Sequence, residues 1–515
     1  MGSYLPLRAG WSLRPVDGSD VPAAVAAATV PATVPGCVHT DLLAAGLIPD
    51  PYLDDNEDRL RWIGRADWRY ELRFDWHPEP GEQVDLVCAG LDTLATLTLN
   101  GREIGATANM HRRYRFPVAE ALRDGENLLQ VRFDSAYRYA EQLREKLGDR
   151  PAAYPPPYAF IRKMACNFGW DWGPALVTAG IWRDIGLFRW RVARIAEVRP
   201  HITVDALEGR VDLRVAVVRQ GGPAGEQPLT VTAEVTGPGA GARGHLVLAA
   251  DRCDTAVSLV VSRPVRWWPR GYGDQPRYRL RVTLSTTDGV PLDSWERRIG
   301  FRTVRLDTAP DRHGTPYTLI VNDVPIFVRG VNWIPDDAFV SRVDRPRYAA
   351  RLAQAAAANV NYLRVWGGGV YESDDFYDLC DELGFLVGQD FLFSCAAYPE
   401  EQPIAEEVAA EARDNVLRLL THPSLVTWTG NNENVWGWHD WGWQAHLNGR
   451  TWGAGYYFDL LPRIVSELDP TRPYWPASPY SGDRGRHPND PAHGSMHICD
   501  VWNERDYLHY RSYTP

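Results

Sequence analysis

The hydrophobic pattern of the chain changes once, near residue 306. Before that point, short segments alternate apolar and polar residues, and after it apolar segments alternate with longer runs of helical character. Strict alternation is typical of antiparallel strands with one buried face, whereas strands that alternate with helices are typical of parallel βα units. The change therefore predicts all-β domains followed by an α/β domain.

Two β-sandwiches are predicted before this change. Alternating segments lie at 68–74, 84–88, 96–99 and 128–133, and a second set lies at 201–204, 211–218, 229–235, 255–261 and 278–284. The glycine-rich stretches 221–225 and 237–244 are expected to form hairpin loops. We predict a jelly-roll β-sandwich over 1–195, of the kind that binds sugars, and an immunoglobulin-like β-sandwich over 196–305.

The segment 306–515 is predicted to be an incomplete (β/α)8 TIM barrel. Strands are expected at 325–332, 361–366, 385–390, 425–429, 474–477 and 495–500, and helices at 345–358, 374–383, 406–420 and 455–468. A complete barrel has eight strands and typically needs about 250 residues. The predicted architecture is therefore multidomain, with a catalytic barrel that lacks its last two strands.

Charge and cysteine content exclude several functions. The 66 acidic residues outnumber the 55 Lys and Arg, giving a net charge of −11. Binding to nucleic acids or anionic membranes is disfavoured because both depend on an excess of basic charge. The seven cysteines form no Cys-x-x-Cys pair, so neither a disulfide framework nor a thiolate zinc site is expected. Without an apolar run of signal-peptide length at its start, the protein is expected to be cytoplasmic.

Polar and aromatic residues follow the predicted barrel strands at their carboxyl ends, where barrels place their active sites. Asn332 ends the first strand, Arg364 and Trp366 end the second, and Glu433 follows the fourth in the sequence Gly-Asn-Asn-Glu. A carboxylate at a strand end, among Asn and Trp side chains, can be tuned into a general acid. Glu433 is therefore the first candidate for a catalytic residue. The 21 Trp outnumber the 14 Phe, and flat indole faces suit sugar rings as well as protein cores.

Seven segments carry a resemblance to a known family. They are VPGCVHTDLLAAGLIPDPYLDDNE (34–57), RWIGRADWRYE (61–71), IRKMACNFGWDWGP (161–174), RGVNWIP (329–335), LRVWGGGVYESDDFYDLCDELG (363–384), QDFLF (389–393) and HPSLVTWTGNNE (422–433). These segments resemble β-mannosidases of glycoside hydrolase family 2. The resemblance implies a retaining exo-glycosidase that removes terminal non-reducing β-D-mannose from β-mannosides or manno-oligosaccharides, with no cofactor and no metal.

The same resemblance implies roles for residues of the barrel. Glu433 is the acid/base that protonates the glycosidic oxygen and later activates water, and Asn432 contacts the 2-hydroxyl of the substrate. Arg364 holds the nucleophile ionised, for which a structural salt bridge is the alternative. Trp366 and Trp441 line the sugar subsite, for which core packing is the alternative.

A loop of the first domain is also implicated by the resemblance. In the family, the loop that contains Trp170, Asp171 and Trp172 reaches across to close the sugar subsite, and Asp171 binds sugar hydroxyls. The family pattern is often Asp-Trp-Gly-Trp-Asp-Trp-Gly-Pro, whereas Asn167 and Phe168 precede Gly169 here. The departure leaves Asp171 in place and changes the outer side of the loop. Packing between domains is the structural alternative for this loop.

A retaining glycosidase needs a second carboxylate about 5–5.5 Å from the acid/base. The family places this nucleophile at the end of strand seven, in a segment like Ser/Ala-Glu-Phe/Tyr-Gly, which these 515 residues do not reach. The nucleophile is therefore expected to lie outside this chain, which is expected to show no β-mannosidase turnover. If turnover occurs, Glu504 is the first internal carboxylate to test.

Two other functions remain open. Another family 2 exo-enzyme, such as a β-galactosidase, β-glucuronidase or exo-β-glucosaminidase, would share the barrel and the acid/base. A non-catalytic sugar-binding protein would fit if the chain ended naturally at 515. His493 and His497 lie in or beside a predicted strand rather than on one helical face, so a metal pair is not expected. The stretch 367–369 lacks the Lys-Ser/Thr of a phosphate-binding loop.

Overall fold

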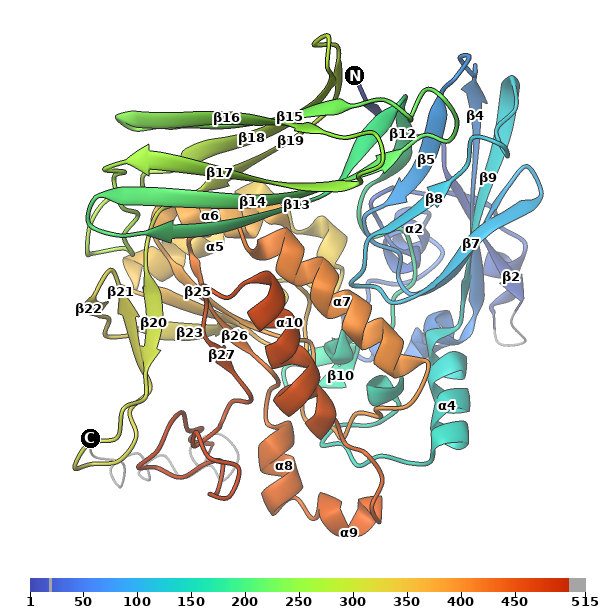
Figure 1. Ribbon diagram of the computed structural model, residues 1–515. Helices are drawn as coiled ribbons and strands as arrows, with labels where there is room; N and C mark the ends of the chain where they lie inside the picture. Colours follow the sequence, from blue (N-terminus) through green and yellow to red (C-terminus); the bar gives the residue numbers. More distant parts are fainter. Residues whose placement is uncertain (18–20, 500–515) are drawn as a thin grey trace.

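The computed structural model describes residues 1–17 and 21–499 and arranges them as two β-sandwiches beside an open α/β sheet (Figure 1). In the first sandwich, the smaller sheet has the order β1 (Ser3–Pro6), β12 (Ile185–Trp190), β5 (Gln83–Cys88), β8 (Tyr114–Pro117). The larger sheet has the order β3 (Val30–Pro31), β2 (Ser12–Asp17), β4 (Asp67–Trp76), β9 (Gly125–Asp134), β6 (Leu94–Leu99), β7 (Arg102–Ala108). Buried side chains of both sheets, such as Leu86 and Val131, form one apolar core.

Short helices and one hairpin complete the first domain. The helices are α1 (Ala23–Ala26), α2 (Val38–Ala44), α3 (Asn56–Arg59) and α4 (Ala136–Leu147). The hairpin consists of β10 (Phe168–Trp170) and β11 (Gly173–Ala175), in which Trp170 pairs with Gly173. This register places Asp171 and Trp172 at the turn, where their side chains extend beyond the hairpin.

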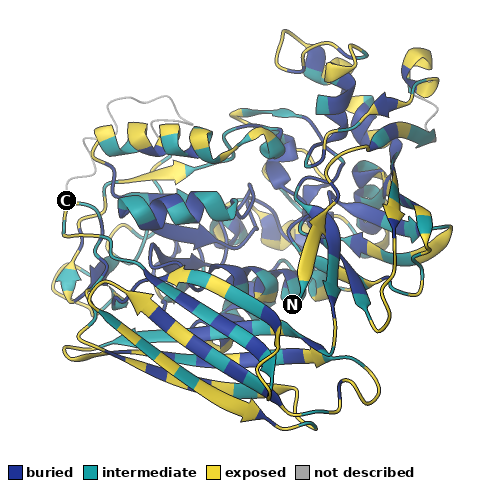
Figure 2. Ribbon diagram, turned by 90° about the horizontal axis from the view of Figure 1, so that it is seen from above, coloured by how far each residue is buried: buried dark blue, intermediate teal, exposed yellow. Residues whose placement is uncertain are grey.

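The second sandwich packs two antiparallel sheets against each other. One sheet has the order β13 (Ala193–Val204), β14 (Glu208–Arg219), β17 (Asp254–Ser262), and the other has the order β16 (Ala240–Leu248), β15 (Leu229–Gly237), β18 (Tyr278–Thr286), β19 (Pro291–Ile299). Buried and exposed residues alternate along these long strands, as the stripes in Figure 2 show. The predicted loop 237–244 was wrong, because a turn at 238–239, with Gly239 at φ +73°, suffices and β16 begins at Ala240.

The α/β part begins with a three-stranded antiparallel sheet of β20 (Val304–Asp307), β21 (Thr318–Val321) and β22 (Val324–Pro325). Five parallel strands follow in sequence order: β23 (Gly330–Trp333), β24 (Tyr362–Val365), β25 (Leu386–Asp390), β26 (Leu425–Thr429) and β27 (Tyr474–Trp475). The main helices between them are α5 (Arg345–Ala357), α6 (Asp374–Leu383), α7 (Ile404–Leu419) and α10 (Leu461–Leu468), the last preceded by a π-helical turn at Tyr456–Leu460. Two short helices, α8 (Asn434–Asp440) and α9 (Trp443–Leu447), follow β26.

This arrangement confirms the predicted fold class, with two sandwiches and an incomplete barrel. The sixth predicted strand, 495–500, is wrong over its described part, 495–499. Ser495 instead forms an isolated antiparallel bridge with Tyr480, and the backbone N–H of His497 donates to the side chain of Asn489 at 2.7 Å. The apolar residues of this segment face a cavity rather than a neighbouring strand. In the part of the chain that is described, no helix has the length and apolar character needed to cross a membrane.

Candidate active site

A cavity of about 890 Å³ lies at the carboxyl ends of the parallel strands. We call it the strand-end cavity, and its polar and aromatic lining includes Tyr154, Trp170, Asp171, Trp172, Asn332, Arg364, Trp366, Cys395, Asn432, Glu433 and His497. Parallel barrels place their active sites at this edge. The first domain and the α/β domain therefore build this cavity together, and seven of the eight predicted site residues meet in it.

Glu433 follows β26 and N-caps α8. Its backbone has φ +67°, and its N–H donates to the carbonyl of Ser478 at 2.8 Å, which directs the side chain into the strand-end cavity. The carboxylate is 18% exposed. Its Oε1 lies 2.7 Å from Nδ1 of His497, and its Oε2 accepts a hydrogen bond from the Cys395 thiol at 3.2 Å.

These contacts decide the charge of Glu433. Burial raises the pKa of the carboxyl, but the hydrogen bond and charge of His497, together with Cys395 and Arg364, outweigh burial and leave the pKa lowered. Burial also raises the pKa of Cys395, so its sulfur remains a thiol that can donate. Glu433 is therefore held as a carboxylate, ready to accept a proton.

Arg364 lies on β24 behind the acid/base candidate. Its guanidinium donates to Asp390 at 2.7 and 3.3 Å, to Asn332 at 3.2 Å and to Asn432 at 3.0 Å. Asp390 is fully buried and also accepts the backbone N–H of Gly367 at 3.1 Å. The salt bridge considered as an alternative for Arg364 is therefore present, and the same guanidinium reaches Asn332 and Asn432 at the cavity wall.

Asn432 connects this ion pair to the contacts of Glu433. Its carbonyl oxygen accepts from Arg364, while its amide group lies 3.1 Å from Oγ of Ser394 and 3.3 Å from Sγ of Cys395. The side chain is nearly fully buried and is fixed from both ends. Asn432 is therefore held at a defined position in the wall of the strand-end cavity.

Aromatic rings from both domains form one wall of the strand-end cavity. The rings of Trp170 and Trp172 meet that of Trp366 edge to face, at centroid distances of 4.9 and 5.5 Å. Tyr154 stacks on Trp170 at 3.9 Å. Burial and then the charge of Asp171 raise the pKa of the Tyr154 hydroxyl. The hairpin turn therefore places Asp171 between two indoles that both contact the α/β domain.

Trp441 is the predicted site residue that the structure does not bring into the strand-end cavity. It follows the last residue of α8, and its ring packs against Trp436 at 5.8 Å and Trp443 at 5.4 Å. Helix α8 carries it away from Glu433 into this tryptophan cluster. Trp441 thus lies outside the lining of the strand-end cavity, and its place in the sugar subsite stays a prediction.

Sequence reasoning missed many residues of the strand-end cavity, among them Tyr154, Cys395 and His497. Tyr154 and Cys395 come from irregular segments, and no motif pointed to them. His497 was considered only as a metal ligand. The position of His497 within the last predicted strand, 495–500, was the one available signal for it.

One cluster of metal-ligand type occurs elsewhere in the described residues. The side chains of Asp378, Asp381 and His422 lie within 4.8 Å of one another. Nδ1 of His422 lies 2.7 Å from Asp381, which also accepts the N–H of Ser424 at 3.0 Å. These contacts explain the cluster as a buried hydrogen-bonded pair of His422 and Asp381 with Asp378 nearby. Residues of the strand-end cavity show no comparable group of ligands.

Replacing His497 with alanine is expected to raise the pKa of Glu433, because the hydrogen bond and charge that oppose the effect of burial are removed. The measurement is the ¹³C shift of the glutamate carboxyl groups as a function of pH, with Glu433→Gln used to assign the signal. His493→Ala is the matched control, since His493 contacts Thr315 at 2.9 Å. A Glu433 pKa that stays the same or falls would show that His497 does not hold the carboxylate ionised.

Comparison with known proteins gives consistent matches over nearly the whole chain. Three family models match in succession: the glycosyl hydrolase 2 galactose-binding domain-like model over 11–183, the glycosyl hydrolases family 2 model over 193–302, and the family 2 TIM barrel domain over 315–480. The beta-mannosidase of Bos taurus is 35% identical over 98% of this chain and 60% of its own length. Beta-mannosidase B of Thermothelomyces thermophilus is 34% identical, over 97% and 59%.

Solved structures agree with these matches. The crystal structure of a beta-D-mannosidase from Dictyoglomus thermophilum has a TM-score of 0.89 at 36% identity, and the match covers 98% of this chain and 60% of that one. An exo-chitosanase from Amycolatopsis orientalis shares the fold, with a TM-score of 0.69 at 19% identity over 92% and 53%. The chain therefore spans about 60% of the length of the curated relatives it matches.

Proposed function

Because this chain belongs to glycosyl hydrolase family 2, we propose that it carries the acid/base and much of the sugar-binding wall of a retaining, exo-acting β-mannosidase. The observation that carries the proposal is the position of Glu433. Its carboxylate enters a Trp-lined cavity at the end of a parallel strand, beside Arg364 and Asn432. The relatives named β-mannosidase, at 34–36% identity, support mannose as the sugar.

The hairpin of the first domain supports the exo mode of action. Trp170 and Trp172 close one side of the strand-end cavity by their contacts with Trp366. A cavity closed in this way takes the end of a saccharide rather than its middle. We assign Asp171 to hydroxyls of the terminal sugar and Asn432 to its 2-hydroxyl, where a hydrogen bond strengthens in the oxocarbenium-like transition state.

In the proposed double displacement, Glu433 acts twice. It first gives a proton to the glycosidic oxygen while a second carboxylate attacks the anomeric carbon, and the glycosyl–enzyme then reacts with a water whose proton returns to Glu433. The ionised Glu433 of this structure is the form that serves the second step. A neighbouring carboxylate raises the pKa of such a group by like-charge repulsion, which favours the protonated form needed in the first step.

No described residue is assigned as the nucleophile. Within residues 1–17 and 21–499, the carboxylates that line the strand-end cavity are Asp171 and Glu433. Asp390 is fully buried and occupied by Arg364 and Gly367. Glu504 lies outside the described residues, so the structure does not bear on it.

Azide rescue tests the proposed role of Glu433 in the 515-residue chain. With p-nitrophenyl β-D-mannoside alone, nitrophenol release is expected to match buffer, because no carboxylate of the described residues is assigned to attack the anomeric carbon. Azide is expected to restore release by forming the N–C1 bond of an α-mannosyl azide as the C1–O bond breaks. Because the pKa of Glu433 is lowered in this structure, the part of the rescued rate in which Glu433 protonates the leaving oxygen is expected to grow as the pH falls toward that pKa. General acid catalysis contributes about 10²–10⁴-fold when the acid is protonated, so Glu433→Gln is expected to lose the rise of the rescued rate at low pH and to leave the rate at high pH unchanged.

The same assay separates the alternatives. Rescue and binding that favour the galactoside, glucuronide or glucosaminide over the mannoside would replace mannose by that sugar. Mannoside binding without azide-dependent release would contradict the acid role of Glu433 and favour a sugar-binding protein. Turnover without azide would mean that an internal carboxylate acts as the nucleophile, and Glu504→Gln would then be the next variant.

A further inference from the structure

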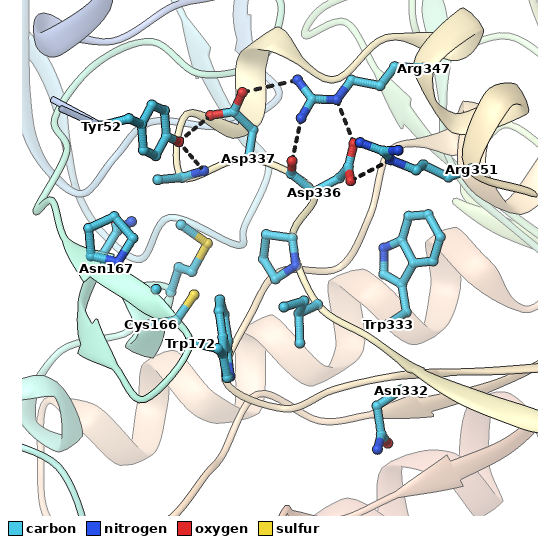
Figure 3. Close-up of a pocket in the computed structure, with 16 residues that line it drawn as sticks. Tyr52, Cys166, Asn167, Trp172, Asn332, Trp333, Asp336, Asp337, Arg347 and Arg351 are labelled. Atoms are coloured by element: carbon cyan, nitrogen blue, oxygen red, sulfur yellow. Dashed lines mark hydrogen bonds and ion pairs between the residues drawn. The ribbon is translucent and has the colours of Figure 1, made fainter. Parts of the chain in front are cut away.

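A second cavity, of about 520 Å³, lies beside the strand-end cavity and shares Trp172, Asn332 and Ile334 with it (Figure 3). We call it the side cavity. Its remaining wall comes from Tyr52 and the segment 164–167 of the first domain, and from the β23–α5 connection and α5 of the α/β domain. The two cavities are therefore neighbours with Trp172 in the wall of both.

Charged side chains on one side of the side cavity form a compensated network. Arg347 donates to Asp336 at 2.5 Å and to Asp337 at 3.0 Å. Arg351 donates to Asp336 at 2.8 Å, and the hydroxyl of Tyr52 donates to Asp337 at 2.7 Å. Two carboxylates and two guanidiniums thus line the side cavity, and Arg342, outside its lining, also pairs with Asp337 at 2.7 Å. Every charge at this wall therefore has an opposite partner, and the network offers hydrogen bonds to a polar ligand.

Trp172 faces this network across the side cavity in Figure 3. The side chain is 39% exposed although it lies between two domains. An indole face covers the C–H face of a sugar ring, while carboxylate and guanidinium groups pair with neighbouring hydroxyls. A network that only held the β23–α5 connection in place would need neither a cavity nor a partly exposed indole. The volume lies within the range of about 300–1,000 Å³ that is usual for small-molecule sites.

We infer that the side cavity is an accessory saccharide site, which binds a neutral mono- or disaccharide unit against Trp172, Asp336 and Arg351. The sugar class rests on the proposed function, whereas the existence of a second site rests on the side cavity itself. Because Trp172 lines both cavities, an occupant of the side cavity packs against the hairpin turn that also carries Asp171.

Equilibrium dialysis of labelled β-1,4-mannobiose against the full 515-residue chain tests this inference. Two classes of site are expected. Arg351→Ala removes a charged hydrogen-bond donor from the side cavity and is expected to weaken one class about tenfold. Asn432→Ala is expected to weaken the other class, which belongs to the strand-end cavity.

Arg413→Ala is the matched control. Arg413 has the same side-chain exposure as Arg351, 45%, and likewise forms one helix-surface ion pair, with Glu467, but it lies on α7 outside both cavities. It is expected to leave both classes unchanged.

The outcomes distinguish the inference from the proposed function. A single class, sensitive to Asn432→Ala and insensitive to Arg351→Ala, would overturn the accessory site and leave the proposed function standing. If Arg351→Ala weakens one class of site and Asn432→Ala weakens none, the result would support the accessory site and count against the proposed function. Equal weakening by Arg351→Ala and Arg413→Ala would overturn the inference as a general charge effect.

Discussion

Replacing Glu411 with alanine is expected to lower the free energy of opening the junction between the first domain and the α/β domain by about 3–5 kcal/mol. Glu411 lies on α7 and is 2% exposed. It accepts two hydrogen bonds from Arg162 of the first domain, at 2.6 and 2.8 Å, and one from Asn109 at 2.9 Å. Without the carboxylate, the buried charge of Arg162 has lost its counter-ion, and removal of one partner of a buried pair is costly.

The effect of pH on this pair has a definite sign. Burial raises the pKa of Glu411, but Arg162 and its other hydrogen-bond partners outweigh burial and leave the pKa below its ordinary value of 4.5. A carboxyl with a lowered folded pKa contributes stability above its unfolded pKa and loses it as the pH falls through the folded value. The difference between wild type and Glu411→Ala is therefore expected to be full at pH 7 and to shrink below about pH 4.5.

Native-state hydrogen exchange measured by mass spectrometry checks this prediction, because it reports local opening in a multidomain chain. The relevant peptides are those of α7 and of the segment 158–167. Glu467→Ala, on α10, is the control, since its pair with Arg413 of α7 is half exposed and is expected to contribute less than about 1 kcal/mol. Equal effects of the two variants would contradict the importance of the buried pair.

The fold follows largely from local pattern. The alternation predicted both sandwiches because one face of each strand is buried, and β26 lies at the predicted residues 425–429. Prediction failed at 495–499, where apolar residues face a cavity instead of a sheet. The hydrophobic period indicates that a side chain is buried, but it does not indicate which part of the protein buries it. The loop predicted at 237–244 was wrong for a related reason. Its glycines indicated a loop, but β16 is a largely exposed strand that accommodates them.

The sequence predicted the site residues that parallel strands position, but it did not predict those that irregular segments position. Arg364 and Glu433 end parallel strands, so their convergence follows from the topology. Tyr154 and His497 reach the strand-end cavity from irregular segments, whose paths depend on tertiary contacts that have no sequence period. Trp441 also follows a short helix, and its ring packs in a local tryptophan cluster that the sequence pattern does not predict.

Replacing Arg364 with methionine is expected to destabilise the parallel sheet around β24 and β25 by about 3–5 kcal/mol at pH 7. Asp390 is fully buried, and Arg364 is its charged partner among the described contacts, while Gly367 supplies a backbone N–H. Burial already raises the pKa of Asp390 although Arg364 opposes it. Removing Arg364 raises this pKa further, because the attraction is lost and the desolvation stays.

The carboxyl of Asp390 changes the stability of the fold with pH in the opposite direction to the carboxyl of Glu411. A carboxyl with a raised folded pKa binds a proton more tightly in the folded state, so it destabilises the fold at high pH and this cost falls as the pH drops through the folded value. Arg364→Met is therefore expected to recover part of its lost stability between pH 7 and pH 5. Hydrogen exchange of peptides that contain β24 and β25, corrected for intrinsic rates, measures this recovery.

A second substitution isolates the charge of Asp390 as the cause. In the background of Arg364→Met, Asp390→Asn keeps an oxygen that accepts the N–H of Gly367 and removes the ionisable group. The double variant is expected to be more stable than Arg364→Met at pH 7 and to lose the recovery at pH 5. Two results together would contradict this account: Arg364→Met loses the same stability at both pH values, and Asp390→Asn does not relieve the loss. They would mean that the packing of the Arg364 side chain matters and its charge does not.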